Sequence, residues 1–416
     1  MSEHDDKRPP RDTSGQPDLT LIKNNAQSPV RRVIRWTVRM IILGAAVFIA
    51  LFVWQNADRL APSRIEEWFD SIYTSAGVGN GFPLPVAGSV VRNMDVSDGD
   101  IAFLTDTSLM LVNDTGYEIV NRQHGFQTPV MRLSDMRALI YDRGGTGYRV
   151  EGRRRTIYTG DADEKILAGD IGPGGQMLLV TRARGNYIAD MRLYDRDGNR
   201  TEFQWLSAEN LVLDAAIAPD EKGAAAILVS AEEGDIVSTA AIFNFYGGEP
   251  KQIAYPGTLL TAVRYCGDRI LLIGDDQCIS LSLSGDDPIA YSYKGDHLAA
   301  FSIDSGGSLA VALSSDRDRG GASLIFLDAK LTAQGFTDHT GSIHALFCSG
   351  DRVAVLMPGR ALLYNQKGQL QATLPAASAS SAMCIAHGEV YVAGVTGIDR
   401  LGGGEAPLPA ISSGDE

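Results

Sequence analysis

The feature that most constrains this chain is a unit of about 40 residues that recurs from residue 82 to residue 401. Each unit holds a first strand, an apolar second strand, a loop, a third strand, a Gly/Asp turn and a polar fourth strand. The second strands are rich in alanine, valine and leucine: DIAFLTD, RALIYD, GQMLLVT, AAAILVS, RILLIGD, SLAVALS, RVAVLMP and EVYVAGV. Self-similarity at this period indicates an array in which neighbouring units bury one another's faces.

Four short strands per unit predict an all-β fold, a β-propeller with one sheet per blade. Residues 82–401 hold 320 positions, which divide into eight units of about 40, whereas seven blades would need units of about 46. Eight blades are therefore favoured, with seven as the alternative. The last unit lacks a fourth strand, while FPLPVAG precedes the first unit without a partner. We expect this N-terminal segment to complete the last blade, because an open sheet edge promotes association.

An apolar run over residues 36–56 predicts one transmembrane helix before the propeller. The 19 residues from Trp36 to Trp54 would span roughly 28 Å as a helix, about the thickness of the hydrocarbon core. Arginines are dense before the run and sparse after it, which predicts a cytoplasmic N-terminus and an extracytoplasmic C-terminal domain in a bacterial cell membrane. A cleaved signal peptide is the alternative, but its basic region would be unusually long.

The remaining segments are assigned from composition and periodicity. Residues 1–30 are polar and rich in Pro and Asp, which predicts a disordered cytoplasmic tail. Residues 63–76 place apolar side chains at helical spacing, which predicts a short juxtamembrane amphipathic helix. Its apolar face would pack on the folded domain, rest at the membrane surface, or bind a partner helix. The propeller is assigned to residues 82–402 and a flexible C-terminal tail to residues 403–416.

Two levels of resemblance support this reading. Residues 215–230 and 338–356 look like blade openings of the WD40 class, although no Trp-Asp dipeptide ends a third strand. The segments DTSLMLVN, QHGFQTPVMRLS and YDRGGTGYRVE carry a more specific likeness. Through them, residues 36–401 resemble a bacterial family of single-span membrane proteins with an exported WD40-like propeller and no assigned function. The resemblance implies the fold and the topology, and it implies no mechanism.

Motifs for cofactor or metal binding have simpler interpretations here. The GGTG segment falls at a second-to-third strand loop and lacks the flanking residues of a nucleotide cradle, so we interpret it as a turn. Asp195, Asp197, Asn199 and Glu202 superficially resemble a calcium loop, but the glycine is fourth rather than sixth. An Asp-Gly hairpin turn explains them, with a weak surface calcium site as the alternative. We therefore expect no cofactor and no metal.

Histidines and cysteines are expected to have structural roles. Three histidines fall between a fourth strand and the next first strand, where we expect hydrogen bonds within the blade: His124, His297 and His339. They lie in different blades, so a joint metal site is not expected. The four cysteines are expected to be buried and unpaired: Cys266, Cys278, Cys348 and Cys384. Cys348 and Cys384 form the one plausible disulfide pair.

Charge and motif content limit the function. Residues 60–416 carry 28 basic and 45 acidic side chains, which disfavours nucleic acid as a ligand. Neither HExxH nor GxSxG occurs. We therefore expect a non-enzymatic binding or scaffolding module that contacts an envelope protein or peptide. The alternatives are an enzyme with a site built from blade loops and a receptor that signals through its cytoplasmic tail.

Candidate binding residues come from the longest second-to-third strand loops, TRARGNYIAD, SAEEGDIVST and SSDRDRGGAS. In repeat proteins such insertions gather on one face, which is often the binding face. Since all three loops emerge at the same end of their blades, they predict a binding surface on one rim. Its candidate residues are Arg182, Arg184, Tyr187, Glu232, Asp235, Arg317 and Arg319.

Overall fold

The chain divides into two units, residues Met1–Leu60 and Ala61–Glu416. The computed structural model describes residues 36–44, 46–47, 77–86, 89–134, 136–304, 306–314 and 321–402. In the first unit, residues 36–44 and 46–47 are helical. Within the described part of the chain, no helix is both long and apolar enough to cross a membrane. The predicted span over 36–56 lies partly outside the described residues, and the segments 1–30, 63–76 and 403–416 lie entirely outside them.

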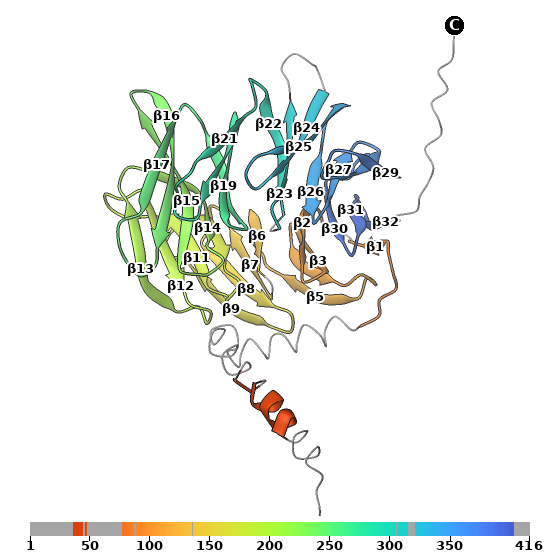
Figure 1. The fold of residues 1–416 in the computed structure, drawn as a ribbon, viewed down its shortest axis with the longest axis horizontal. Coiled ribbons are helices and arrows are strands. Elements are labelled where there is room, and N and C mark those ends of the chain that lie inside the picture. The colour runs from red at the N-terminus through yellow and green to blue at the C-terminus, as the bar shows by residue number, and fades with distance from the viewer. Residues whose placement is uncertain are drawn as a thin grey trace, which may run out of the picture. The chain divides into compact units, whose positions relative to one another are not determined.

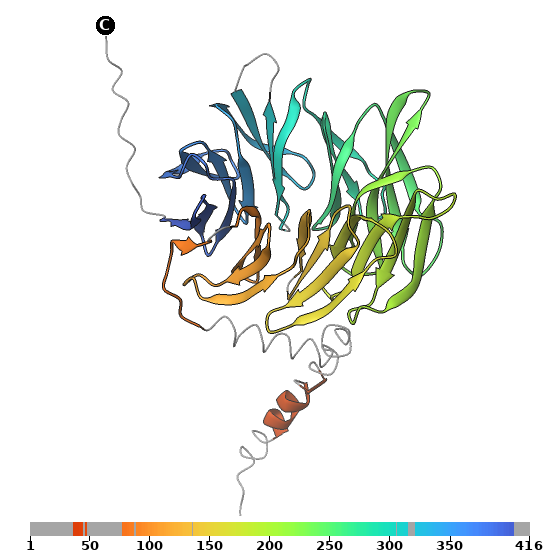
Figure 2. The same cartoon turned by 180° about the vertical axis from the view of Figure 1, so that it is seen from behind.

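The second unit is an eight-bladed β-propeller, in which each blade is a four-stranded antiparallel sheet (Figures 1 and 2). The first four blades take their strands in chain order. Blade 1 holds β2 (Val91–Ser97), β3 (Asp100–Thr105), β4 (Ser108–Val112) and β5 (Glu118–Gln123). Blade 2 holds β6 (Pro129–Leu133), β7 (Arg137–Asp142), β8 (Gly147–Gly152) and β9 (Thr156–Asp161). Blade 3 holds β10 (Ile166–Ile171), β11 (Met177–Arg182), β12 (Ala189–Tyr194) and β13 (Arg200–Ser207), and blade 4 holds β14 (Leu211–Ile217), β15 (Gly223–Glu232), β16 (Asp235–Asn244) and β17 (Lys251–Pro256).

The next three blades repeat this order, and the eighth closes the ring. Blade 5 holds β18 (Leu260–Cys266), β19 (Arg269–Gly274), β20 (Gln277–Ser282) and β21 (Ile289–Ser292). Blade 6 holds β22 (His297–Ile303), β23 (Ser308–Ser314), β24 (Gly321–Asp328) and β25 (Ala333–Thr340). Blade 7 holds β26 (Ala345–Ser349), β27 (Arg352–Met357), β28 (Arg360–Asn365) and β29 (Leu370–Pro375), and blade 8 holds β30 (Ala382–Ala386), β31 (Glu389–Ala393), β32 (Gly397–Leu401) and the N-terminal β1 (Leu84–Pro85).

The closure confirms the expectation from the sequence. Strand β1 pairs antiparallel with β32, with Leu84 opposite Ile398 and Pro85 opposite Gly397. The first strand of the domain is thus the outermost strand of its last blade, and the ring has eight blades rather than seven. Closing the sheet in this way protects the edge of β32.

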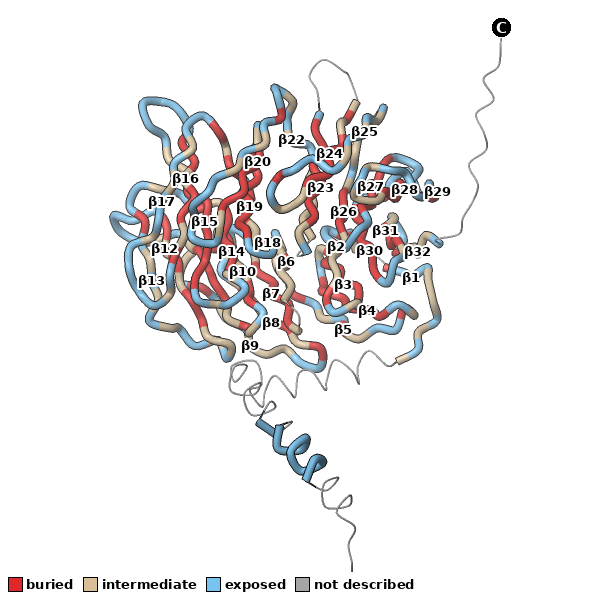
Figure 3. Tube along the Cα trace, viewed as in Figure 1, coloured by how far each residue is buried: buried red, intermediate tan, exposed pale blue. Residues whose placement is uncertain are grey.

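The core lies between neighbouring blades, and the second strands occupy its centre (Figure 3). Every residue of β3 and of β19 is buried. One cluster joins Leu178 of blade 3 to Ala226 and Leu228 of blade 4. The small and branched side chains suit the close packing of two sheets. Fourth strands alternate between exposed and partly buried residues, as in β13, because one face of each is solvated.

The first strands of five blades carry a register shift near their start. In blade 4 the pairing with β15 shifts between Val212 and Asp214, and the other shifts occur in blades 1, 3, 5 and 6. Such a bulge redirects the side chains around it. This irregularity sets where Asp214 points, and it becomes important at the candidate site.

The turns agree with the sequence reading. The GGTG segment connects β7 to β8, with Gly144 at φ 85°. The Asp195 segment is the hairpin turn from β12 to β13. There the Asp195 carboxylate accepts hydrogen bonds from the backbone N–H groups of Asp197 (2.9 Å) and Asn199 (2.8 Å).

Of the three histidines, His124 follows the prediction. Its Nε2 donates to the carbonyl oxygen of Thr105 in the same blade (3.2 Å). The prediction was wrong for His339, which lies inside β25 and bonds through Nε2 to the Tyr364 hydroxyl of the next blade (3.0 Å). His297 is the first residue of β22. All four cysteines are free and buried.

Candidate functional site

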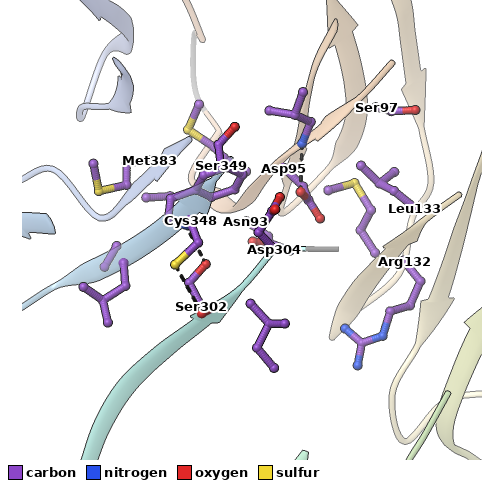
Figure 4. Close-up of a pocket in the computed structure, with 18 of the residues that line it drawn as sticks. Asn93, Asp95, Ser97, Arg132, Leu133, Ser302, Asp304, Cys348, Ser349 and Met383 are labelled. Carbon is purple, nitrogen blue, oxygen red and sulfur yellow. Dashed lines mark hydrogen bonds between the residues drawn. The ribbon is translucent and has the colours of Figure 1, made fainter. Parts of the chain in front are cut away.

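The first strands surround a central cavity of about 720 Å³, a volume typical of small-molecule sites (Figure 4). Every blade presents its first strand to the propeller axis, and seven of the eight blades contribute lining residues. Blade 4 is the exception. The lining mixes charged, hydroxyl and apolar side chains. A cavity of this composition can bind a ligand that has both a charged and an apolar part.

Four charged residues occupy equivalent positions in four first strands. Asp95 pairs with Ala102, Arg132 with Leu139, Asp170 with Leu178 and Arg264 with Leu271, in each case near the turn into the second strand. Equivalent positions in a propeller project in the same way toward the axis. Two carboxylates and two guanidinium groups therefore meet in the cavity, although they come from blades 1, 2, 3 and 5.

Both guanidinium groups are directed at Asp214, the buried residue at the blade 4 bulge. Arg264 Nη1 lies 2.6 Å from Asp214 Oδ2, and Arg132 Nη2 lies 3.2 Å from Oδ1. The backbone N–H of Val263 donates a third bond (3.1 Å). Burial acts to raise the pKa of Asp214, but Arg264 and Arg132 outweigh it and hold this pKa below the usual value.

The other two carboxylates lack such a partner. Asp95 accepts a hydrogen bond from the N–H of Val96 (2.8 Å), and Asp170 accepts one from the N–H of Ile217 (2.8 Å). Among the described residues, no side chain donates a hydrogen bond to either. Burial raises the pKa of both groups, although Arg132 and Arg264 partly offset it. Both carboxylates face the cavity as acceptors with free capacity.

The remaining lining adds an apolar wall and a protonated thiol. The apolar wall consists of half-buried side chains from blades 2, 5, 6 and 7: Leu133, Tyr265, Phe301, Ile303 and Phe347. Burial raises the pKa of Cys348 to about 12, and its thiol donates to the carbonyl oxygen of Ser302 (3.3 Å; Figure 4). A thiol in that state is a poor nucleophile. Within the described ranges, no group of three or more His, Cys, Asp or Glu side chains could hold a metal ion.

The loop residues expected from the sequence lie on adjacent blades 3 and 4. Arg182 ends β11, Arg184 and Tyr187 lie in the following loop, Glu232 ends β15 and Asp235 begins β16, and all five are exposed. Arg184 Nε pairs with Glu164 Oε1 at 2.5 Å. Arg317 and Arg319 lie outside the described residues.

Four exposed apolar side chains that were not predicted from the sequence accompany Tyr187 near these loops. We call this surface the rim patch, and it comprises Tyr187, Ile188, Leu206, Leu211 and Ile236, each between 37% and 49% exposed. Backbone pairing holds its blade 3 part together, since the N–H of Ile188 donates to the carbonyl oxygen of Ser207 (2.7 Å). Exposed acidic side chains accompany it: Glu209, Glu232, Glu233 and Asp235. Tyr187 was predicted as a binding residue, and the other four lie at or next to the ends of apolar strands, where their exposure is not evident from the sequence.

These features define the protein as an eight-bladed β-propeller with a polar central cavity. Its fold is similar to Sqt1 from Saccharomyces cerevisiae (10% identity, TM-score 0.58), covering 78% of this chain and 99% of that one. The C-terminal WD40 domain of Sif2 has 12% identity and a TM-score of 0.57, with coverages of 78% and 99%. BamB from Moraxella catarrhalis has 11% identity and a TM-score of 0.52, with coverages of 76% and 99%. At these identities the likeness shows the fold alone.

Sequence comparison assigns the chain to a family. The model of a family of unknown function, DUF5711, matches residues 73–371, and the chain belongs to that family. No curated protein sequence matches it.

Proposed function

We propose that this protein is a non-enzymatic binding or scaffolding propeller of the bacterial cell envelope. Residues 36–56 would anchor it as a single transmembrane helix, with the N-terminus in the cytoplasm and the propeller outside the cytoplasm. The apolar length of this run and the arginines that precede it support the topology. Propellers with WD40-like repeats commonly present one face to a protein partner, which supports the binding role.

The observation that carries the binding role is the rim patch. Scattered apolar side chains on a surface need no explanation, but five on neighbouring strand ends of two blades form a candidate contact surface. A partially exposed tyrosine among them suits an interface, because its ring supplies contact area and its hydroxyl a hydrogen bond. The acidic side chains around the rim patch favour a partner that surrounds an apolar side chain with lysine or arginine.

Crosslinking in intact cells tests the binding role. A photoreactive amino acid at Ile236 should capture a reproducible envelope protein or peptide, and the double variant Leu211→Ser/Ile236→Ser should abolish capture from a probe at Tyr187. Tyr246→Ser is the matched control, because Tyr246 is 79% exposed on the turn at the opposite end of blade 4. If a probe at Tyr246 captures the same partner and one at Ile236 captures none, the rim patch is not the binding surface.

The topology requires a separate test. A protease added to intact spheroplasts should degrade the propeller while sparing a tag placed before residue 30. Degradation that occurs only after lysis would contradict the proposed orientation. A chain recovered in the soluble fraction would contradict the anchor itself, and the rim patch could still act in that case.

A further inference from the structure

We propose that the central cavity binds a small organic cation, an ammonium or guanidinium group on a short apolar stem, between the carboxylates of Asp95 and Asp170. This site is separate from the rim patch and goes beyond the proposed scaffolding role. It rests on the charges, hydrogen bonds and apolar lining of the cavity.

The charge balance of the cavity favours a cation. Asp95 and Asp170 line the cavity together with Arg132 and Arg264, but both guanidinium groups pair with Asp214, which does not line it, so these five groups include one carboxylate in excess. Both guanidinium groups direct their ion pairs at Asp214. The lining also holds Arg92, Asp98 and Asp304, and Asp98 lies 3.7 Å from Nη2 of Arg153.

The fold gives the ionised forms of Asp95 and Asp170 few hydrogen bonds. Each is only partly exposed, and each receives one backbone hydrogen bond, a weak compensation for a charge in a partly enclosed site. Burial raises the pKa of both, which shows that the fold alone does not favour their ionised forms. A bound ammonium or guanidinium group would supply the missing donors, because such a group presents several N–H bonds at once.

The cavity wall selects an organic cation over a metal ion. Magnesium and calcium require a shell of about six to eight oxygen ligands, and the described residues offer no cluster able to hold a metal. Tyr265, Phe301 and Phe347 line the same cavity and are only half-buried. Aromatic faces attract organic cations, and they also cover an apolar stem.

The same chemistry can come from a free amine or from a lysine or arginine side chain of a polypeptide. Isothermal titration calorimetry of the purified full-length chain distinguishes these sources. The probes are butylammonium, 1,4-diaminobutane and agmatine, with butanol and butyrate as neutral and anionic counterparts of the same length. A flexible decapeptide with one central lysine and blocked ends represents the polypeptide source.

We expect the amines to bind and butanol and butyrate to give no saturable heat. Asp95→Asn and Asp170→Asn keep an acceptor for Val96 and Ile217 but remove the charge, and each should weaken amine binding by at least about tenfold. Asp195→Asn is the matched control, because Asp195 lies on a turn outside the cavity and Asn365 holds the equivalent turn in blade 7. Saturation by the lysine peptide with weak binding of free amines would assign the site to a polypeptide side chain.

The absence of binding by every amine and by the peptide would overturn the proposal. Saturable binding of butyrate that Arg264→Gln abolishes would also overturn it and assign the cavity to anions. If either Asn variant loses the propeller's circular dichroism spectrum, the test is made with the wild-type chain alone. Tighter binding of butylammonium than of butyrate would then support the cation site, and the reverse would overturn it. The rim double variant should bind amines normally, so failure of the scaffolding proposal and failure of this one are distinguishable.

Discussion

Arg264 of blade 5 donates a hydrogen bond of 2.6 Å to Asp214 of blade 4, and the same carboxylate receives Arg132 from blade 2 at 3.2 Å. One buried side chain therefore connects three blades near the propeller axis. The blade 4 bulge makes this possible, because the register shift lies between Val212 and Asp214. Among the described residues, both arginines form ion pairs with Asp214 and neither forms one with Asp95 or Asp170.

Removing this carboxylate should strongly destabilise the protein. Asp214→Ala leaves two partly buried guanidinium groups without their anion, and breaking a buried ion pair costs about 3–5 kcal/mol. Asp214→Asn keeps a hydrogen-bond acceptor and should lie between the wild-type protein and the alanine variant. Urea unfolding followed by tryptophan fluorescence measures the difference. Asp286→Ala is the control, because its ion pair with Lys251 lies on the surface and its loss should leave the midpoint almost unchanged.

Asp95→Asn and Asp170→Asn should each stabilise the protein at neutral pH, unlike the Asp214 variants. The folded-state pKa of each carboxyl is raised above the value of 3.8 expected without burial. Such a group stabilises the fold fully below pH 3.8, and this contribution is lost as the pH rises through the folded-state pKa. The asparagine variants should therefore melt above the wild-type protein at pH 7, and the gap should close as the pH falls toward 3.8. Lower melting temperatures at pH 7 would show that the ionised carboxylates stabilise the fold.

The repeat could be predicted from the sequence because each blade needs the same local pattern. The buried second strands recur with small apolar residues, and an unpaired N-terminal segment matched a blade with a missing strand. The turns between third and fourth strands could also be predicted from the sequence. Asp195 and Asn365 stand three residues before a glycine with positive φ, Gly198 and Gly368, and cap the turn with their side chains.

The cavity could not be predicted in the same way. Its four charged residues each look like an ordinary polar residue in a partly exposed strand, and each lies in a different blade: Asp95, Arg132, Asp170 and Arg264. The strand register shows that they face the same axis. The bulge that aims Asp214 leaves no mark in a single sequence. Arg153 is a related case, since it is the first of three consecutive arginines between β8 and β9 and is nevertheless buried against Asp100 of blade 1.

Gly397→Ala should weaken the ring closure. A Cβ on Gly397 would lie 2.5 Å from the carbonyl oxygen of Leu84, so β1 and β32 would have to separate. Overpacking of this kind costs about 1–3 kcal/mol. The melting temperature should fall, and limited proteolysis should cut the chain near residue 84 sooner than in the wild-type protein. Gly402→Ala is the control, because a Cβ there meets nothing within 4 Å. Equal proteolysis of the two variants would mean that the closing strand contributes little.

Asn365→Ala tests the turn cap that recurs between third and fourth strands. The Asn365 side-chain oxygen accepts hydrogen bonds from the N–H groups of Lys367 and Gln369, each at 3.0 Å. Water can replace part of this bonding on the exposed turn, so the loss should be about 0.5–1.5 kcal/mol in the free energy of unfolding. Asn365→Asp should retain nearly full stability, because Asp195 makes the same contacts in blade 3. Denaturant unfolding of the three proteins measures this, and an aspartate variant as unstable as the alanine variant would contradict the shared capping role.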